Sequence, residues 1–138
     1  MKNIEIQNAV NAFGRVPVNK VKNDQIRMTL IYDYRKLRKA SREIEQARTD
    51  IVEKFQADFA DEMLDVQVLR ESGRPVTDHD EFLKAEASVN RLIKEMFQEE
   101  YAGELELQRV PLDDFVKAVK DGDYTFEDLA CLDGIVIE

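Results

Sequence analysis

Hydrophobic residues recur every three or four positions over a long stretch that begins near Asn23, and no Gly or Pro interrupts this stretch before Gly73. Such spacing puts one apolar stripe along one face of an α-helix. The pattern predicts a helix over residues 23–64, with Asn23 or Asp24 as its N-cap. At 1.5 Å per residue the helix would be on the order of 60 Å long. The stripe consists of Ile26, Leu30, Tyr34, Leu37, Ala40, Ile44, Ala47, Ile51, Phe55 and Phe59.

A helix of this length needs a partner that covers its apolar stripe. Residues 78–101 carry a second helical stripe, and residues 65–76, with Gly73 and Pro75, predict a turn or a small hairpin between the two helices. The two helices would form an antiparallel hairpin, but the second is shorter by roughly 20–25 Å. The stripe is therefore interpreted either as the core of a hairpin or as an oligomer interface, and both interpretations stay open.

The two ends of the chain predict smaller elements. Residues 3–13 predict a short helix that is capped by Asn3 and followed by Gly14 in the left-handed conformation. Residues 104–138 predict a strand at 104–108, where Glu and Leu alternate, and short helices at 113–120 and from Thr125 onward. The apolar residues 135–137 would pack on the core or pair with 104–110.

These elements together define the expected fold. It is mainly α, a long antiparallel helical hairpin with a short N-terminal helix and a small α+β cap at the C-terminus. The chain of 138 residues is expected to form a single domain over 1–138. Apolar face residues expected in the last helix are Phe126, Leu129 and Leu132, with Asp128 as the capping-box partner of Thr125.

The composition indicates the cellular compartment in which the protein is expected. The single cysteine, Cys131, allows no intramolecular disulfide, which favours a reducing compartment. The N-terminus lacks the long apolar segment of a signal peptide, and no apolar run is long enough to span a membrane. A cytoplasmic location in the host cell is therefore expected.

Charge is distributed very unevenly along the chain. Residues 15–42 hold nine basic and two acidic residues, for a net charge of +7, whereas residues 43–138 hold ten basic and twenty-six acidic residues, for a net charge of −16. The densest basic run is a candidate site for an anion or a protein partner. The alternative is that these side chains are solvated or paired with acids. The run consists of Arg35, Lys36, Arg38, Lys39 and Arg42.

No catalytic or metal motif stands out. The only histidine, His79, lies among acids at the start of a predicted helix, where neighbouring side chains diverge and do not converge on one ion. Cys131 is interpreted as a small buried hydrophobe. The acids at 121, 123, 127 and 128 lack the spacing of a calcium loop. We expect no catalytic residue, no metal and no cofactor, and the chain is not expected to be an enzyme.

The order of segments resembles a family of small uncharacterised proteins encoded by tailed phages and prophages. The resemblance spans nearly the whole chain and implies a phage context with a structural or assembly role, but no functional residue. It rests on Asn8-Ala9-Val10, Val16-Pro17-Val18, Tyr34-Arg35-Lys36-Leu37, Ile51-Val52-Glu53-Lys54-Phe55, the Glu/Leu alternation at 104–107, Val110-Pro111-Leu112 and Asp128-Leu129-Ala130-Cys131-Leu132.

Two functions follow from these observations. The favoured one is a non-enzymatic phage or prophage accessory protein, virion-associated or active in assembly, that binds itself or another phage or host protein through its helical surfaces. A homo-oligomer is the expected state. The alternative is a host-directed binder or inhibitor in which the basic 15–42 segment captures a nucleotide or another anionic ligand. The overall charge of −9 argues against nonspecific nucleic-acid binding, and no membrane partner is expected.

Overall fold

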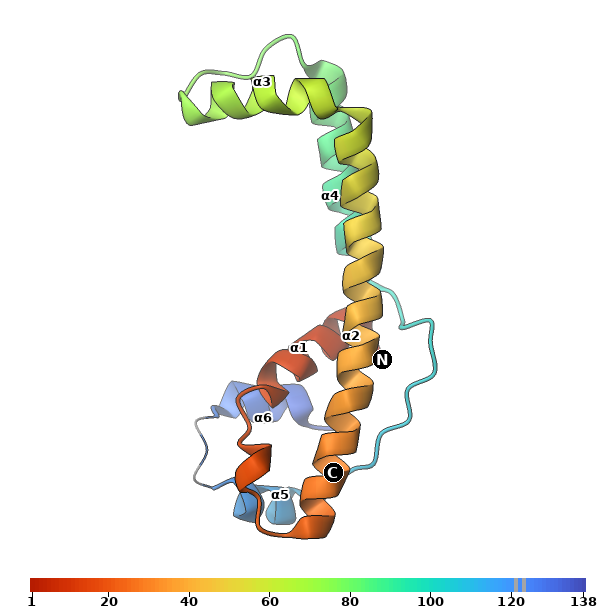
Figure 1. Cartoon of the computed structure of the whole chain (residues 1–138), viewed down its shortest axis with the longest axis vertical. Helices are drawn as coiled ribbons and strands as arrows, with labels where there is room; N and C mark the ends of the chain where they lie inside the picture. The colour runs from red at the N-terminus through yellow and green to blue at the C-terminus, as the bar shows by residue number, and fades with distance from the viewer. Residues whose placement is uncertain (121, 123) are drawn as a thin grey trace. The chain divides into compact units, whose positions relative to one another are not determined.

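The computed structural model describes residues 1–120, 122 and 124–138, and within these the chain is mainly helical (Figure 1). Asp121 and Asp123, two of the acids weighed for calcium, lie outside the described residues. The contacts divide the chain into two compact units where the sequence predicts a single domain. We call Met1–Ile44 with Glu99–Glu138 the terminal unit, and Glu45–Gln98 the middle unit. The elements are α1 (Asn3–Phe13), the 3₁₀-helix η1 (Val18–Lys20), α2 (Asp24–Asp58), α3 (Ala60–Glu71), α4 (Asp80–Gln98), α5 (Leu112–Val119) and α6 (Phe126–Leu132).

Helix α1 covers the range that its pattern predicts, although its caps differ from the prediction. Lys2 is the N-cap, and its backbone N–H donates to the Glu5 carboxylate at 2.7 Å. Gly14 follows the helix at φ −61°, in the right-handed region, so the expected left-handed glycine cap is wrong. The N–H of Gly14 continues the helical pattern and bonds to Val10 O at 3.0 Å, which removes the need for a left-handed turn.

The core of the terminal unit lies between α1, α6, α5 and the first part of α2. Helix α1 packs against α6, and Arg15, just after the end of α1, binds Asp128 of α6. Thr125 caps α6 as the sequence predicts, because its side chain accepts from the N–H of Asp128. Phe126, expected on the apolar face of α6, is instead 91% exposed. The largest buried side chains of this core are Phe13, Phe115, Ile6, Leu30, Leu37, Leu132 and Ile137.

The connection 99–111 contains no strand, so the strand predicted at 104–108 is wrong. Its alternation is real, since Leu105 and Leu107 are half-buried while Glu104 and Glu106 are exposed. Residues 104–108 have no neighbouring strand to pair with. The backbone groups Glu106 O and Gln108 N–H instead bond to side chains of α2. Within the described residues the only pairing with the C-terminus is an isolated bridge between Val110 and Ile137, and the expected α+β cap is absent there.

Helix α2 ends at Asp58 and not at residue 64, because the backbone turns at Phe59 (φ −125°, ψ 28°) before α3 begins. The ring of Phe59 lies 5.3 Å from that of Phe55 and 5.8 Å from that of Phe82, measured between centroids. Phe55 and Phe82 are 5.2 Å apart and join α2 to α4. Packing of this aromatic cluster outweighs the local helix propensity of the sequence.

Residues 65–71 are helical, so the turn or hairpin predicted at 65–76 begins only after α3 ends. Val66 is 1% exposed and Val68 is 60% exposed. Residues two apart share one face in a strand but lie on nearly opposite sides of a helix, so the opposite exposure of these two valines fits the helix and not a strand. The apolar pair Met63 and Val66, three residues apart, follows the helical spacing.

Helix α4 is shorter than the predicted 78–101. Asp78 has a positive φ of 64°, which keeps it outside the helix, and Asp is one of the few residues that tolerate this conformation. At the other end, Glu99 O accepts from Asn3 N at 2.9 Å and Tyr101 N donates to Met1 O at 2.8 Å. These bonds fix the segment to the N-terminus and end the helix at Gln98. No helix in the described part of the chain is both long and apolar enough to cross a membrane.

Candidate functional site

The predicted apolar stripe of the long helix lies in both units. In the terminal unit, Leu30, Leu37 and Ile44 are buried at 0%, 0% and 4% exposure. Half-buried members of the stripe are Ile26 and Tyr34 in the terminal unit and Ile51 and Phe55 in the middle unit. Burial along α2 therefore decreases at the boundary between the two units.

The middle unit buries few of its apolar side chains. Within 45–98, all of which the structure describes, only Val66 and Phe82 among the hydrophobic residues reach full burial, at 1% and 3% exposure. Leu64 and Val68 on α3 are 68% and 60% exposed, and Leu92 on α4 is 49% exposed. Other apolar side chains of α4 are only half-buried: Leu83, Ala85, Val89, Ile93, Met96 and Phe97. We call the exposed side chains of Leu64, Val68 and Leu92, together with these half-buried side chains of α4, the open apolar face.

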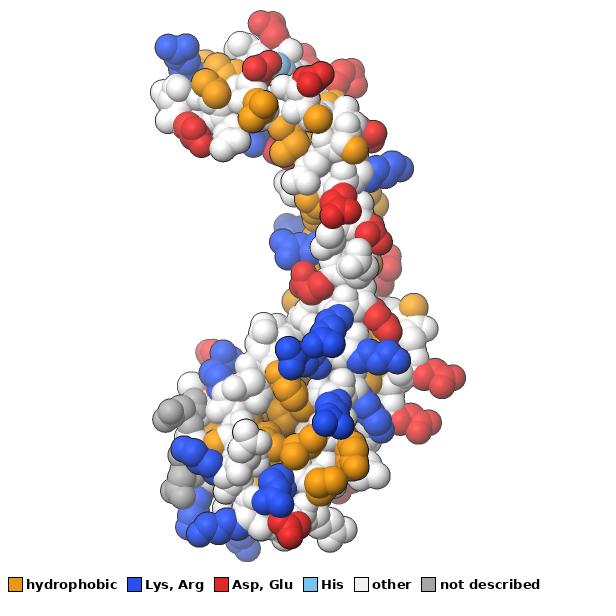
Figure 2. Space-filling view, in the orientation of Figure 1, with side chains coloured by type: hydrophobic (Ala, Val, Ile, Leu, Met, Phe, Trp, Pro, Cys, Tyr) orange, Lys and Arg blue, Asp and Glu red, His pale blue; other side chains and the backbone are white. Residues whose placement is uncertain are grey.

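Acidic side chains surround the apolar side chains of the middle unit. Residues 45–98 hold seven basic and thirteen acidic residues, for a net charge of −6. Figure 2 shows hydrophobic atoms next to Asp and Glu side chains over α3. One ion pair inside the unit joins α3 to α4, with Arg70 binding both carboxylate oxygens of Glu86 at 2.9 and 2.7 Å. The hydrogen bond from Arg70 lowers the pKa of Glu86.

The predicted basic run borders two hollows of the terminal unit, because α2 contributes side chains to both of them. Lys36 and Lys39 line a hollow on the side of the connection 99–111. Arg35 and Arg38 line a second hollow on the side of η1. Arg42 is exposed and lines neither of these hollows.

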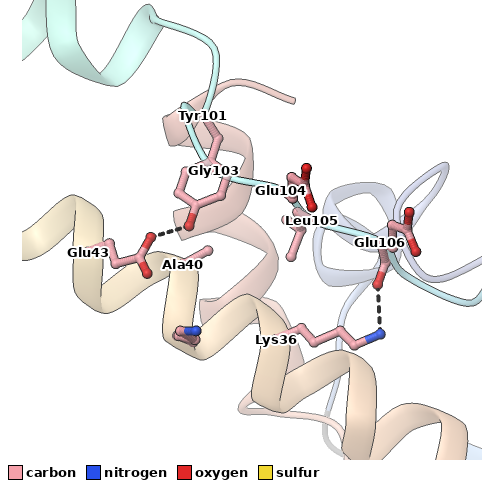
Figure 3. A pocket seen from close by; sticks show the side chains of 9 residues that line it. Lys36, Ala40, Glu43, Tyr101, Gly103, Glu104, Leu105 and Glu106 are labelled. Carbon is pink, nitrogen blue, oxygen red and sulfur yellow. Dashed lines mark hydrogen bonds between the residues drawn. The ribbon is translucent and has the colours of Figure 1, made fainter.

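The first hollow, of about 490 Å³, is bordered by polar contacts that hold the connection against α2 (Figure 3). Lys36 Nζ donates to Glu106 O at 3.0 Å. The Tyr101 hydroxyl donates to Glu43 Oε2. This hydrogen bond, with burial and the charge of Glu43, raises the pKa of Tyr101 to about 12. Lys36 and Glu43 therefore hold the connection in place, which is a structural role for part of the basic run.

Asp33 makes the third contact of α2 with the connection, and sequence reasoning missed it. Its Oδ1 accepts from the N–H of Gln108 at 3.0 Å, and the residue is 1% exposed. Burial raises the pKa of Asp33 to about 6, against the opposing effects of the Gln108 hydrogen bond and of Lys36. A signal was present in the sequence, because Asp33 lies on the same helix face as Leu30 and Leu37, where a polar residue is unusual.

The second hollow, of about 530 Å³, has an apolar floor and a basic edge. Tyr34 lies in it, with its ring centroid 5.2 Å from that of Phe13. Arg35 and Arg38 lie one helical turn apart on α2, and Lys20 is contributed by η1. The remaining lining residues are Gly14, Val16, Pro17, Val18, Asn19 and Ile31.

The residues weighed for catalysis or metal binding have other partners. His79 Nδ1 lies 3.1 Å from Glu62 Oε2, within the middle unit. Asp128 accepts a hydrogen bond from Arg15 Nε at 2.9 Å. This bond has the largest effect and the bond from Thr125 N–H the next largest, and together they lower the pKa of Asp128 to about 2. Cys131 is half-buried in the terminal unit. The described residues contain no group of three or more acids, His or Cys placed to hold a metal ion.

Comparison with protein-family models, with curated proteins and with solved structures finds no match to this chain. The open apolar face of the middle unit and the hollows of the terminal unit are the surfaces of this chain most suited to binding.

Proposed function

We propose that this chain is a non-enzymatic accessory protein of a phage or prophage that works by protein–protein assembly through the open apolar face of the middle unit. One observation carries the assembly part of the proposal. Val66 and Phe82 are the only fully buried hydrophobic residues of 45–98, a range described throughout, while Leu64, Val68 and Leu92 are 68%, 60% and 49% exposed. The phage context rests on the sequence resemblance, and the site of action would be the host cytoplasm or the virion.

The proposed occupant of this face is a second copy of the chain. The end of α2 and helix α4 meet at Phe55 and Phe82, which supports the antiparallel hairpin that the sequence predicts. Two such hairpins would cover their apolar stripes by forming a four-helix bundle, in which side chains from facing helices share one core. Closed twofold dimers are also the commonest soluble oligomers.

The charge of the middle unit sets a condition on this assembly. Each copy contributes a net charge of −6 from residues 45–98, so two copies repel each other at low ionic strength. Salt screens this repulsion, with a Debye length of about 8 Å at physiological ionic strength against about 30 Å at 0.01 M. Self-association is therefore expected to strengthen as salt is added, which is opposite to the behaviour of an assembly held by ion pairs.

Sedimentation velocity with exposed-residue variants tests the proposal. The test variant combines Leu64→Gln, Val68→Thr and Leu92→Gln, which remove apolar surface without opening the core. The control combines Leu112→Gln and Val116→Thr on α5 of the terminal unit, whose side chains are 48% and 39% exposed. We expect the native chain and the control to sediment as dimers or larger species, and the test variant to sediment as a monomer with unchanged helix content.

If the test variant and the native chain both sediment as the same oligomer, the assignment of the interface to the middle unit is contradicted. The phage part is tested separately by mass spectrometry of purified particles of a phage that encodes the chain. Absence from the particles, together with a monomeric native chain, would overturn the proposed function as a whole.

A further inference from the structure

The hollow beside η1 combines apolar lining residues with three cations, two from α2 and one from η1. Its volume of about 530 Å³ lies within the usual range for small-molecule sites, roughly 300–1,000 Å³. The floor includes the aromatic rings of Phe13 and Tyr34, and the edge includes Lys20, Arg35 and Arg38. Such pockets bind a ligand body by apolar contact and fix its orientation with a few polar groups.

The three cations at this edge are available to a ligand. Arg35 and Arg38 are exposed neighbours on one face of α2, spaced i, i+3. Within the described residues, the side chains of Arg35, Arg38 and Lys20 make no ion pair and no hydrogen bond. Two other arginines of the same unit do form ion pairs, Arg15 with Asp128 and Arg27 with Asp24 at 2.6 Å.

Lys20 also lines a third hollow of the same unit, which is polar and has a volume of about 380 Å³. Three more lysines line this hollow, and Asp114 is the one acid among its lining residues in the described part of the chain. The lysines are Lys22, Lys117 and Lys120. A positive region therefore extends from the apolar hollow past Lys20, and Figure 2 shows Lys and Arg side chains around apolar atoms on the terminal unit.

We propose that the hollow beside η1 binds a nucleoside polyphosphate, with the base against Tyr34 and the phosphates held by Arg35, Arg38 and Lys20. Guanidinium groups bind phosphate through paired, charge-assisted hydrogen bonds. An aromatic floor stacks a planar base. The lysine-lined hollow shares Lys20 with this hollow and supplies further cations for a chain of phosphates. This site is confined to the terminal unit and does not depend on self-association.

Titration calorimetry on the full chain tests the two halves of this ligand separately. The probes are ATP, which has both halves, adenosine, which has only the base and sugar, and inorganic tripolyphosphate, which has only the charge. We expect ATP to bind about tenfold or more tightly than either of the other two probes, which corresponds to a free-energy difference of about 1.4 kcal/mol.

Matched charge variants locate the site. Arg35→Gln with Arg38→Gln removes two charges at the hollow, and Lys39→Gln with Arg42→Gln removes two charges from the same helix outside it. We expect the first pair to weaken ATP binding by about tenfold or more and the second pair by no more than about twofold. In Tyr34→Leu, we expect ATP to lose its advantage over tripolyphosphate while tripolyphosphate binding stays unchanged.

Three results would overturn the proposal. The first is no heat of binding with millimolar ATP. The second is equal affinity for ATP and tripolyphosphate, which would indicate a simple anion site. The third is equal weakening by both variant pairs, which would indicate binding to the general positive field of α2.

Discussion

Asp33 illustrates at the residue scale how the terminal unit fixes a segment that has no secondary structure. Its buried carboxylate receives the backbone N–H of Gln108, Lys36 binds Glu106 O, and Glu43 binds Tyr101. The sequence places these three α2 residues on a helix, and the polar residue at 33 interrupts an apolar face. Their partners in 99–111 are not predictable from the pattern, because hydrogen bonds to a segment without regular secondary structure have no periodic signal in the sequence.

The pKa of Asp33 predicts a pH dependence of stability. Folding raises this pKa from the ordinary 3.8 to about 6, so between pH 4 and pH 6 the folded state holds a proton that the unfolded state has lost. The contribution of Asp33 to the free energy of unfolding therefore increases as pH falls from about 6 to about 4, and decreases as pH rises through 6. The full contribution is on the order of 3 kcal/mol at most.

Asp33→Asn removes this titration and keeps the Oδ1 acceptor for Gln108. Urea unfolding followed between pH 4 and pH 7 is expected to show a smaller decrease in stability with rising pH for this variant than for the native chain. Asp50→Asn is the control, since Asp50 is exposed and its Oδ1 accepts a hydrogen bond from Gln46 Nε2 at 2.8 Å. Parallel pH profiles for the native chain and Asp33→Asn would contradict the prediction.

Gly103 is required by the position of the Tyr101 ring. A Cβ at residue 103 would lie 2.6–2.7 Å from the hydroxyl and ring atoms of Tyr101, so Gly103→Ala is expected to displace the ring and break its hydrogen bond to Glu43. The pKa of Tyr101, about 12 in the native chain, should then return towards the ordinary 10.0. Tyrosinate absorbance during alkaline titration measures this change, and Glu43→Gln should give a similar decrease. An unchanged titration curve in both variants would show that the hydrogen bond does not set this pKa.

At the scale of elements, the sequence predicts well where local signals decide and poorly where packing decides. The apolar spacing of α1 and the Thr125–Asp128 capping box are local, and both are present in the structure. The turn at Phe59 depends on packing against the ring of Phe82, which is far from Phe59 in the sequence. The alternation at 104–108 correctly indicates which side chains are half-buried, but a strand also needs a partner strand.

Phe82 is expected to contribute most to the junction of α2, α3 and α4. It is 3% exposed and contacts the rings of Phe55 and Phe59. Phe82→Ala should therefore cost about 3–5 kcal/mol, as for other buried aromatic residues. Phe126→Ala, at a side chain that is 91% exposed, should stay within about 0.5 kcal/mol of the native chain. Denaturant unfolding followed by circular dichroism compares the two, and equal costs would contradict the assignment.

At the scale of the whole molecule, the two units bury their apolar residues to different degrees. The terminal unit has a core with several fully buried large side chains, whereas Val66 and Phe82 are the only fully buried hydrophobic residues among the described positions 45–98. The sequence predicts the long stripe and its need for further cover, but not where along the stripe cover is missing. Nor does it predict that the basic run divides between two hollows, since that depends on which segments pack on each side of α2.

We propose that the middle unit covers its open apolar face with a second copy of the chain. Multi-angle light scattering over a range of concentrations, at physiological and at low salt, measures the molar mass of the native protein and decides whether this second copy is bound. A mass that reaches at least twice the 16.0 kDa of one chain, and that decreases on dilution or at low salt, is the predicted result. A mass of 16.0 kDa at every concentration and salt level would contradict the claim.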